Sequence, residues 1–67
     1  MTIKQLRTTT QPYIDIDIVY GNTHITLTAD DYTTMQAFGD FLIDNISIKD
    51  EETISAALIL QAVKNNI

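Results

Sequence analysis

The chain contains no cysteine and only one histidine among its 67 residues. The absence of cysteine excludes disulfide bonds and thiolate metal sites, and the single imidazole of His24 argues against a histidine-based metal site. We therefore expect no cofactor and no metal. A chain this short must then gain its stability from a well-packed core or from self-association.

Basic residues are also scarce, because four Lys and Arg stand against nine Asp and Glu, for a formal net charge of −5. Proteins that bind a phosphate backbone carry clustered Lys and Arg, so this balance argues against a nucleic acid as partner. An acidic surface is compatible with docking on a basic protein, or with solubility alone.

Long apolar runs are missing as well. No run approaches the roughly 18 apolar residues of a membrane span, and the N-terminus lacks the apolar stretch of a signal peptide. Together with the absence of cysteine, this predicts a cytoplasmic protein that does not contact a membrane. The hydrophobic content of 45% is normal for a globular chain, so residues 1–67 are expected to form a single small domain.

The clearest pattern present is the alternation of YIDIDIVYGNTHITLT, residues 13–28. Gly21-Asn22 suits a two-residue hairpin turn, because glycine readily adopts a positive φ. The alternation places every large aliphatic side chain except Val19 on one face, and Val19 with the two aspartates on the other, which we expect to be exposed. The expected cross-strand pairs are Tyr20–Thr23, Val19–His24, Ile18–Ile25, Asp17–Thr26, Ile16–Leu27, Asp15–Thr28 and Ile14–Ala29.

Two helices are expected after the hairpin, over about residues 30–45 and 50–65. Asp30 and Asp31 suit the N-terminus of the first helix, and its apolar residues cover a wide arc. Residues 1–12 hold a Thr-rich run closed by Pro12, which favours a loose arm or a short edge strand. The predicted fold is therefore an α+β domain in which a β-hairpin packs on two α-helices.

The second expected helix is apolar on almost every side between residues 54 and 63. Such a helix is normally buried all round, and one hairpin and one helix cannot surround it. We therefore expect a homodimer or a higher oligomer, since a symmetric dimer is the commonest way to cover such a surface. The residues expected to carry this self-association are Ala56, Ile59, Leu60 and Val63.

Four carboxylates are candidates for binding a basic partner: Asp15, Asp17, Asp40 and Asp44. Asp15 and Asp17 share a strand face, and the other two lie one turn apart on the first expected helix, where like charges repel slightly. The alternative is that these residues only keep exposed faces soluble and free of aggregation.

Catalysis is not expected. Asp17 and His24 lie on the same strand face and could supply half of a catalytic set. The chain offers no cysteine, however, and no serine in a recognisable nucleophile context.

We therefore expect a non-enzymatic protein-binding module. Small acidic proteins without cysteine are often inhibitors or regulators encoded by phages or other mobile elements, and we expect this class here. The alternative is a small dimeric DNA-binding or antitoxin-like transcriptional regulator, whose basic arm, with Lys4 and Arg7, would touch nucleic acid.

Overall fold

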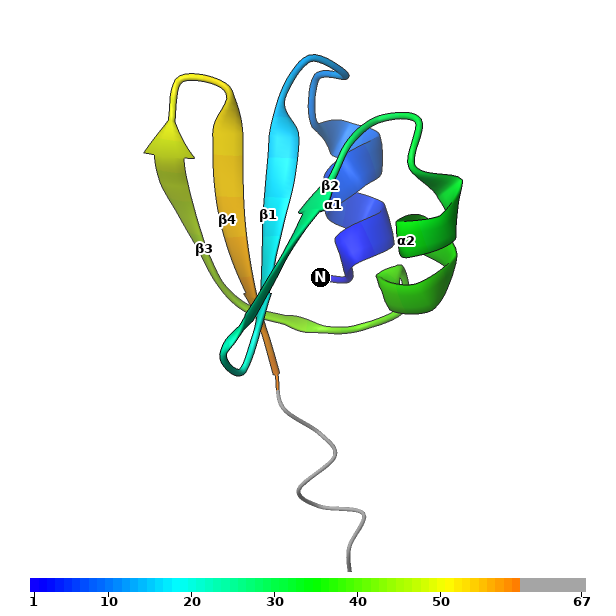
Figure 1. Cartoon of the computed structure of the whole chain (residues 1–67), viewed down its shortest axis with the longest axis vertical. Coiled ribbons are helices and arrows are strands. Elements are labelled where there is room, and N and C mark those ends of the chain that lie inside the picture. Colours follow the sequence, from blue (N-terminus) through cyan, green and yellow to red (C-terminus); the bar gives the residue numbers. More distant parts are fainter. Residues whose placement is uncertain (60–67) are drawn as a thin grey trace, which may run out of the picture.

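The computed structural model describes residues 1–59 and confirms an α+β domain, with two helices and a four-stranded mixed sheet (Figure 1). The strands lie in the order β2-β1-β4-β3. β1 pairs antiparallel with β2, β3 pairs antiparallel with β4, and the central strands β1 and β4 are parallel. The elements are α1 (Ile3–Thr9), β1 (Asp15–Tyr20), β2 (Thr23–Leu27), α2 (Tyr32–Phe38), β3 (Ile43–Asp50) and β4 (Thr53–Leu58).

The first hairpin has the predicted register, from Tyr20–Thr23 at the turn to Ile16–Leu27. Gly21 at the turn has a φ of +62°, the left-handed conformation that glycine adopts without strain. The ladder ends at Ile16–Leu27, so the two further pairs expected beyond it do not form. The chain turns away there, since the Asp31 N–H donates to the Thr28 carbonyl.

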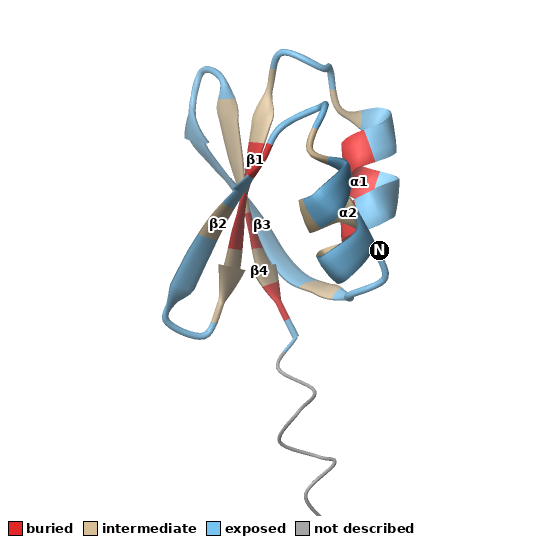
Figure 2. Cartoon of the chain, turned by 45° about the vertical axis from the view of Figure 1, so that its right-hand side comes forward, coloured by how far each residue is buried: buried red, intermediate tan, exposed pale blue. Residues whose placement is uncertain are grey.

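The core lies between one face of the sheet and the two helices, which both cover that face on the β1–β2 side (Figures 1 and 2). Ile16, as expected, is fully buried. The rings of Tyr20, Phe38 and Phe41 pack edge to face, with centroids 5.3–6.4 Å apart, beside this core. The buried apolar residues are Ile3, Leu6, Ile16, Ile18, Leu27, Ala56 and Leu58.

The N-terminal segment is a helix rather than the loose arm or edge strand expected for residues 1–12. Thr2 Oγ1 accepts from the Gln5 N–H, and Gln5 Oε1 accepts from the Thr2 N–H, which forms a capping box. Ile3 and Leu6 lie one turn apart and enter the core. The Thr-Ile-Lys-Gln sequence is itself a capping-box pattern, so a local signal for this helix was present.

The first predicted helix, 30–45, is correct only in its first half. α2 begins after Asp31, whose side chain accepts from the Thr34 N–H at 2.9 Å, and it ends at Phe38. Residues 43–50 form strand β3 instead. The reason is visible in Asn-Ile-Ser-Ile-Lys, where β-branched isoleucines alternate with polar residues at the period of a strand.

The second predicted helix, 50–65, is wrong over its described part, because Thr53–Leu58 form strand β4. A strand between two others, with one face in the core, needs apolar or small residues in succession, as a buried helix does. Asp50, Glu51 and Glu52, expected to begin the helix, make a turn in which the Glu52 N–H donates to Asp50 Oδ1. Residues 60–65 of the prediction lie outside the described residues.

Candidate functional site

Asp17, expected on an exposed face, is buried, with 5% of its surface accessible. His24 Nδ1 lies 3.1 Å and Lys49 Nζ 3.4 Å from its Oδ2 atom. The expectation failed because β1 is not one half of an isolated hairpin but a central strand of the sheet. Lys49 reaches Asp17 from β3 across β4, where the small side chain of Ser55 lies beside Asp17. Asp17 thus holds three strands together and is not free to bind a partner.

The structure does not bring the four predicted partner-binding carboxylates together. Asp15 is partly exposed and pairs with Thr53, beside the turn that joins β3 and β4. Asp40 and Asp44 are exposed, and they lie in the loop after α2 and near the first residue of β3. These two are therefore at the other end of the sheet from Asp15.

The predicted self-association surface is not a helix face. Ala56 lies fully buried in the core, on an interior strand, so it is not available to a second copy. Ile59 is partly exposed just after β4, where its N–H donates to the Leu42 carbonyl. Leu60 and Val63 lie outside the described residues.

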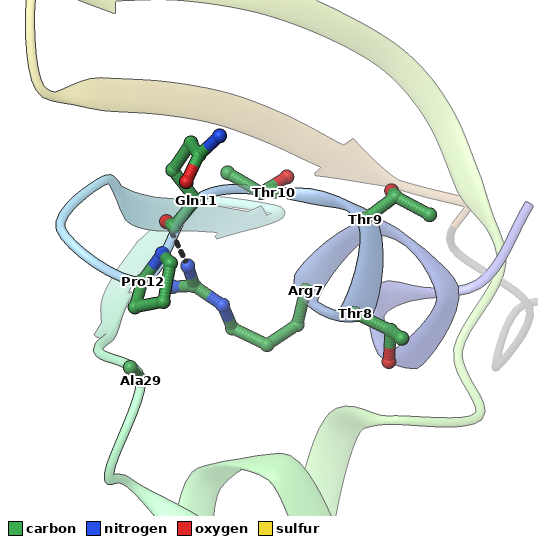
Figure 3. A pocket seen from close by; sticks show the side chains of 7 residues that line it. All are labelled: Arg7, Thr8, Thr9, Thr10, Gln11, Pro12 and Ala29. Atoms are coloured by element: carbon green, nitrogen blue, oxygen red, sulfur yellow. Dashed lines mark hydrogen bonds between the residues drawn. The ribbon is translucent and has the colours of Figure 1, made fainter.

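Arg7, expected in a basic arm, is buried, with 8% of its surface accessible. Its Nη1 donates to the Leu27 carbonyl at 3.3 Å, and its Nη2 donates to the Gln11 carbonyl at 2.7 Å. The side chain borders a hollow of about 360 Å³ lined by residues 7–12 and Ala29 (Figure 3). Within residues 1–59 no carboxylate lies within ion-pair distance of Arg7. The guanidinium therefore ties α1 to the end of β2 and to the following loop through backbone carbonyls.

Titratable and metal-ligating side chains are the groups that catalysis would need. Among residues 1–59 there is no group of three His, Asp or Glu side chains that could hold a metal ion. The Asp17–His24 pair lies on the sheet face away from the helices, since Asp17 alternates with the core residues Ile16 and Ile18. In the same part of the chain, no helix has the length and apolar character needed to cross a membrane.

The outer edge of β3 is the most distinctive feature of the described surface. β3 is the last strand on its side of the sheet. The N-terminal residues cover only the beginning of this edge: the Ile3 N–H donates to the Phe41 carbonyl, and the Ile43 N–H donates to the Met1 carbonyl. Register shifts follow at Ile43/Asn45 and at Ile48/Asp50. Between them, residues 45–48 form a regular segment that no other strand within residues 1–59 pairs with on its outer side, which we call the open stretch.

Backbone groups of two residues in the open stretch point outward. The Asp15 N–H donates to the Glu52 carbonyl. In β4 the backbone N–H and C=O groups of even-numbered residues therefore point toward β1, and those of odd-numbered residues point toward β3. Ser47 pairs with Ser55 and therefore turns its N–H and C=O toward β4. By alternation, the N–H and C=O of Ile46 and Ile48 point away from the sheet.

The side chains of these two residues are exposed even though they project from the helix-bearing face. Ile46 pairs with Ala56 and Ile48 pairs with Ile54, on the side of the sheet that carries the core. The helices do not extend over this half of the sheet (Figures 1 and 2), and Ile46 is 43% and Ile48 is 82% exposed. Sequence reasoning missed both residues, because they lie between the two expected helices, 30–45 and 50–65.

Acidic residues surround the open stretch. Residues 43–53 contain four carboxylates and one lysine, for a net charge of −3, and that lysine is Lys49, which contacts Asp17. The four acidic side chains are exposed at the two ends of the strand: Asp44 at one end, and Asp50, Glu51 and Glu52 at the other. Among the four predicted partner-binding residues, only Asp44 belongs to this surface.

Comparison with known proteins adds no further constraint on this site: no family model, no curated protein and no solved structure matches the chain.

Proposed function

We propose that this chain is a non-enzymatic protein-binding module, with the open stretch of β3 at the centre of its binding surface. The exposure of Ile48 on an edge strand carries this proposal. An isoleucine gains roughly 1.5–3 kcal/mol when it moves from water into an apolar contact, which is a large amount for a domain this small. Natural proteins normally blunt an apolar edge, and a partner is the most direct means of covering this one.

The surrounding charge supports a basic partner. Complementary charge at the rim of an interface speeds association and excludes partners of like charge. With a net charge of −3, the β3–β4 hairpin favours a protein surface rich in Lys and Arg. An inhibitor or regulator that occupies such a surface, carried by a phage or another mobile element and acting in the cytoplasm, fits this proposal.

The proposal does not include the homo-oligomer that the sequence led us to expect. That oligomer required a helix that was apolar all round over residues 54–63, and residues 53–58 are an interior strand. No observation favours the DNA-binding alternative either, because Arg7 is buried and leaves Lys4 as the exposed residue of the expected basic pair.

Affinity capture with matched baits tests the proposal. The wild-type chain, the double variant Ile46→Ser/Ile48→Ser and a control double variant Tyr13→Ser/Tyr32→Ser are each presented to an extract of the source cell or its host. Tyr13 and Tyr32 are large, exposed side chains that belong to neither β3 nor β4, so the control removes apolar surface outside this hairpin. The captured proteins are quantified by mass spectrometry, and the binding of each purified candidate is measured by calorimetry.

We expect a partner that the wild type and the tyrosine variant retain and that the isoleucine variant loses by at least about tenfold in affinity. The circular dichroism of the three baits must agree, so that a loss of binding does not reflect unfolding. Capture that is equal for all three folded baits, or the absence of any specific partner, would reject the proposed binding surface.

A further inference from the structure

We infer that the open stretch of β3 binds its partner by strand addition, and that the partner strand is an extended segment with two alternating apolar residues flanked by Lys or Arg. This inference rests on the proposed function and names the kind of partner for that site. In strand addition, backbone hydrogen bonds supply affinity, and alternate side chains supply specificity.

The chain already uses this edge in the inferred way. Thr2 forms an antiparallel bridge with Leu42, and the hydrogen bonds of residues 1–3 to Phe41 and Ile43 run along the outer side of the strand. Residues 1–3 reach along this edge as far as Ile43, and the backbone groups of Ile46 and Ile48 lie farther along it. A partner strand there would extend an arrangement that the fold begins.

The register follows from the pleat of β3. An antiparallel segment with one residue opposite Ser47 places its two neighbouring residues opposite Ile46 and Ile48, on the same face. Those two positions therefore favour apolar, β-branched side chains. The partner residues three positions before and after the one opposite Ser47 lie level with Asp50 and Asp44. A basic side chain at each of these positions complements the carboxylate there. The inferred pattern is basic-x-apolar-x-apolar-x-basic.

The same geometry argues against a second copy of the chain as the occupant. Two β3 strands related by a two-fold axis at Ser47 would pair Ile46 with Ile48 of the other copy. That register also brings Asp44 level with Asp50 of the other copy, twice in the dimer, and like charges opposite each other are destabilising. Each hairpin carries a net charge of −3, so two copies repel where a basic strand is attracted.

A synthetic peptide tests the inference directly. The probe is acetyl-Lys-Thr-Val-Thr-Val-Thr-Lys-amide, titrated to millimolar concentration into ¹⁵N-labelled full-length protein and followed through backbone amide signals. We expect saturable shifts and slower hydrogen exchange at the N–H groups of Ile46 and Ile48, because these groups would donate to the added strand. Replacing both lysines of the peptide by glutamate should weaken binding by about tenfold or more.

Two proline variants separate strand addition from contact through side chains. Ile48→Pro removes an outward N–H without taking a hydrogen bond from β3–β4, and proline is tolerated on edge strands. Because it also removes the isoleucine side chain, it is compared with Ile48→Ala, which removes that side chain and keeps the N–H. Thr26→Pro is the matched control, because Thr26 lies on β2 at the opposite edge of the sheet. Its backbone N–H points away from β1, since the N–H groups that bond to β1 belong to the residues on either side of it. We expect Ile48→Pro to abolish the peptide binding that Ile48→Ala only weakens, and Thr26→Pro to preserve it, with all three variants shown to be folded by their amide spectra.

Each outcome decides a different claim. The absence of shifts on β3 at millimolar peptide, or equal binding of the lysine and glutamate peptides, overturns the inference that a basic strand binds there. If a captured partner depends on the isoleucines yet binds Ile48→Pro as well as Ile48→Ala, strand addition is wrong and the proposed function stands. Concentration-dependent broadening of the Ile46 and Ile48 amides without peptide would identify a second copy as the occupant and overturn the inference.

Discussion

Replacing Asp17 by asparagine should lower the free energy of unfolding by about 1–2 kcal/mol. A hydrogen bond to a charged group contributes roughly 1.5–3 kcal/mol when it is well buried. The carboxylate of Asp17 is buried, but the side chains of its partners are 60% exposed for His24 and 56% exposed for Lys49. Solvent screening therefore reduces each contact to about 0.5–1 kcal/mol, and the two together give the predicted loss. Asparagine preserves the shape of the side chain, so packing should not contribute.

Urea unfolding at pH 7, followed by far-ultraviolet circular dichroism, measures this change. The melting temperature of a domain of this size falls by roughly 4–8 °C for each kcal/mol of stability lost. Asp15→Asn is the matched control: Asp15 lies on the same strand and makes no ion pair within residues 1–59, so we expect a change below about 0.5 kcal/mol. Lys49→Gln in both backgrounds completes a double-mutant cycle, with an expected coupling of about 0.5–1 kcal/mol. Equal effects of the two asparagine variants, together with no coupling to Lys49, would refute the buried role of Asp17.

Two further perturbations test other parts of the fold. Ile16→Asp should unfold the domain, because a charge at this fully buried position costs more than the roughly 3–5 kcal/mol of stability that a domain of this size holds. The control Asn22→Asp, at the exposed turn, should leave the circular dichroism unchanged. A folded Ile16→Asp variant would contradict the placement of Ile16 in the core. The hydroxyl and the backbone N–H of Thr34 hydrogen-bond Asp31 and hold the pKa of its carboxyl below the ordinary value of 3.8. A depressed folded-state pKa gives stability that is complete above the unfolded-state pKa and is lost as the pH falls through the folded-state pKa. Wild type should therefore lose more stability than Asp31→Asn when urea unfolding is repeated at successively lower pH below 4, and parallel losses would contradict the cap.

The first hairpin was predictable because all the information it needs is local. The alternation of residues 15–20 and 23–27 specifies the faces, and Gly21 specifies the turn, so the register follows without reference to the rest of the chain. The start of a helix near Asp30 and Asp31 was predictable for the same reason, although the cap is Asp31 and not Thr28 or Asp30. The helix of residues 3–9 also has a local signal, the capping box of Thr2 and Gln5, which the low apolar content and the Thr-rich end of the segment obscured.

The second half of the chain was not predictable in this way. The residues of Thr-Ile-Ser-Ala-Ala-Leu, 53–58, are apolar or small in succession, which suits a buried strand and a buried helix equally. Acidic residues before this stretch are typical of a helix N-terminus, and here they form the turn between β3 and β4 instead. The choice between the two structures depends on whether β1 offers an open edge for pairing, and that is a property of the tertiary fold.

The position of β4 explains both errors at the candidate site. By pairing with β1 on one side and β3 on the other, β4 makes β1 a central strand and moves β3 to the edge of the sheet. Asp17 then lies where Lys49 can reach it from the neighbouring hairpin, so a residue chosen as a solvent-exposed binding group becomes an internal link. Ile48, which composition would place in the core, instead lies at the edge, where neither helix covers it. A single strand placement thus buries the carboxylate and exposes the isoleucine, and for this reason the binding surface that we propose lies at the edge of the second hairpin.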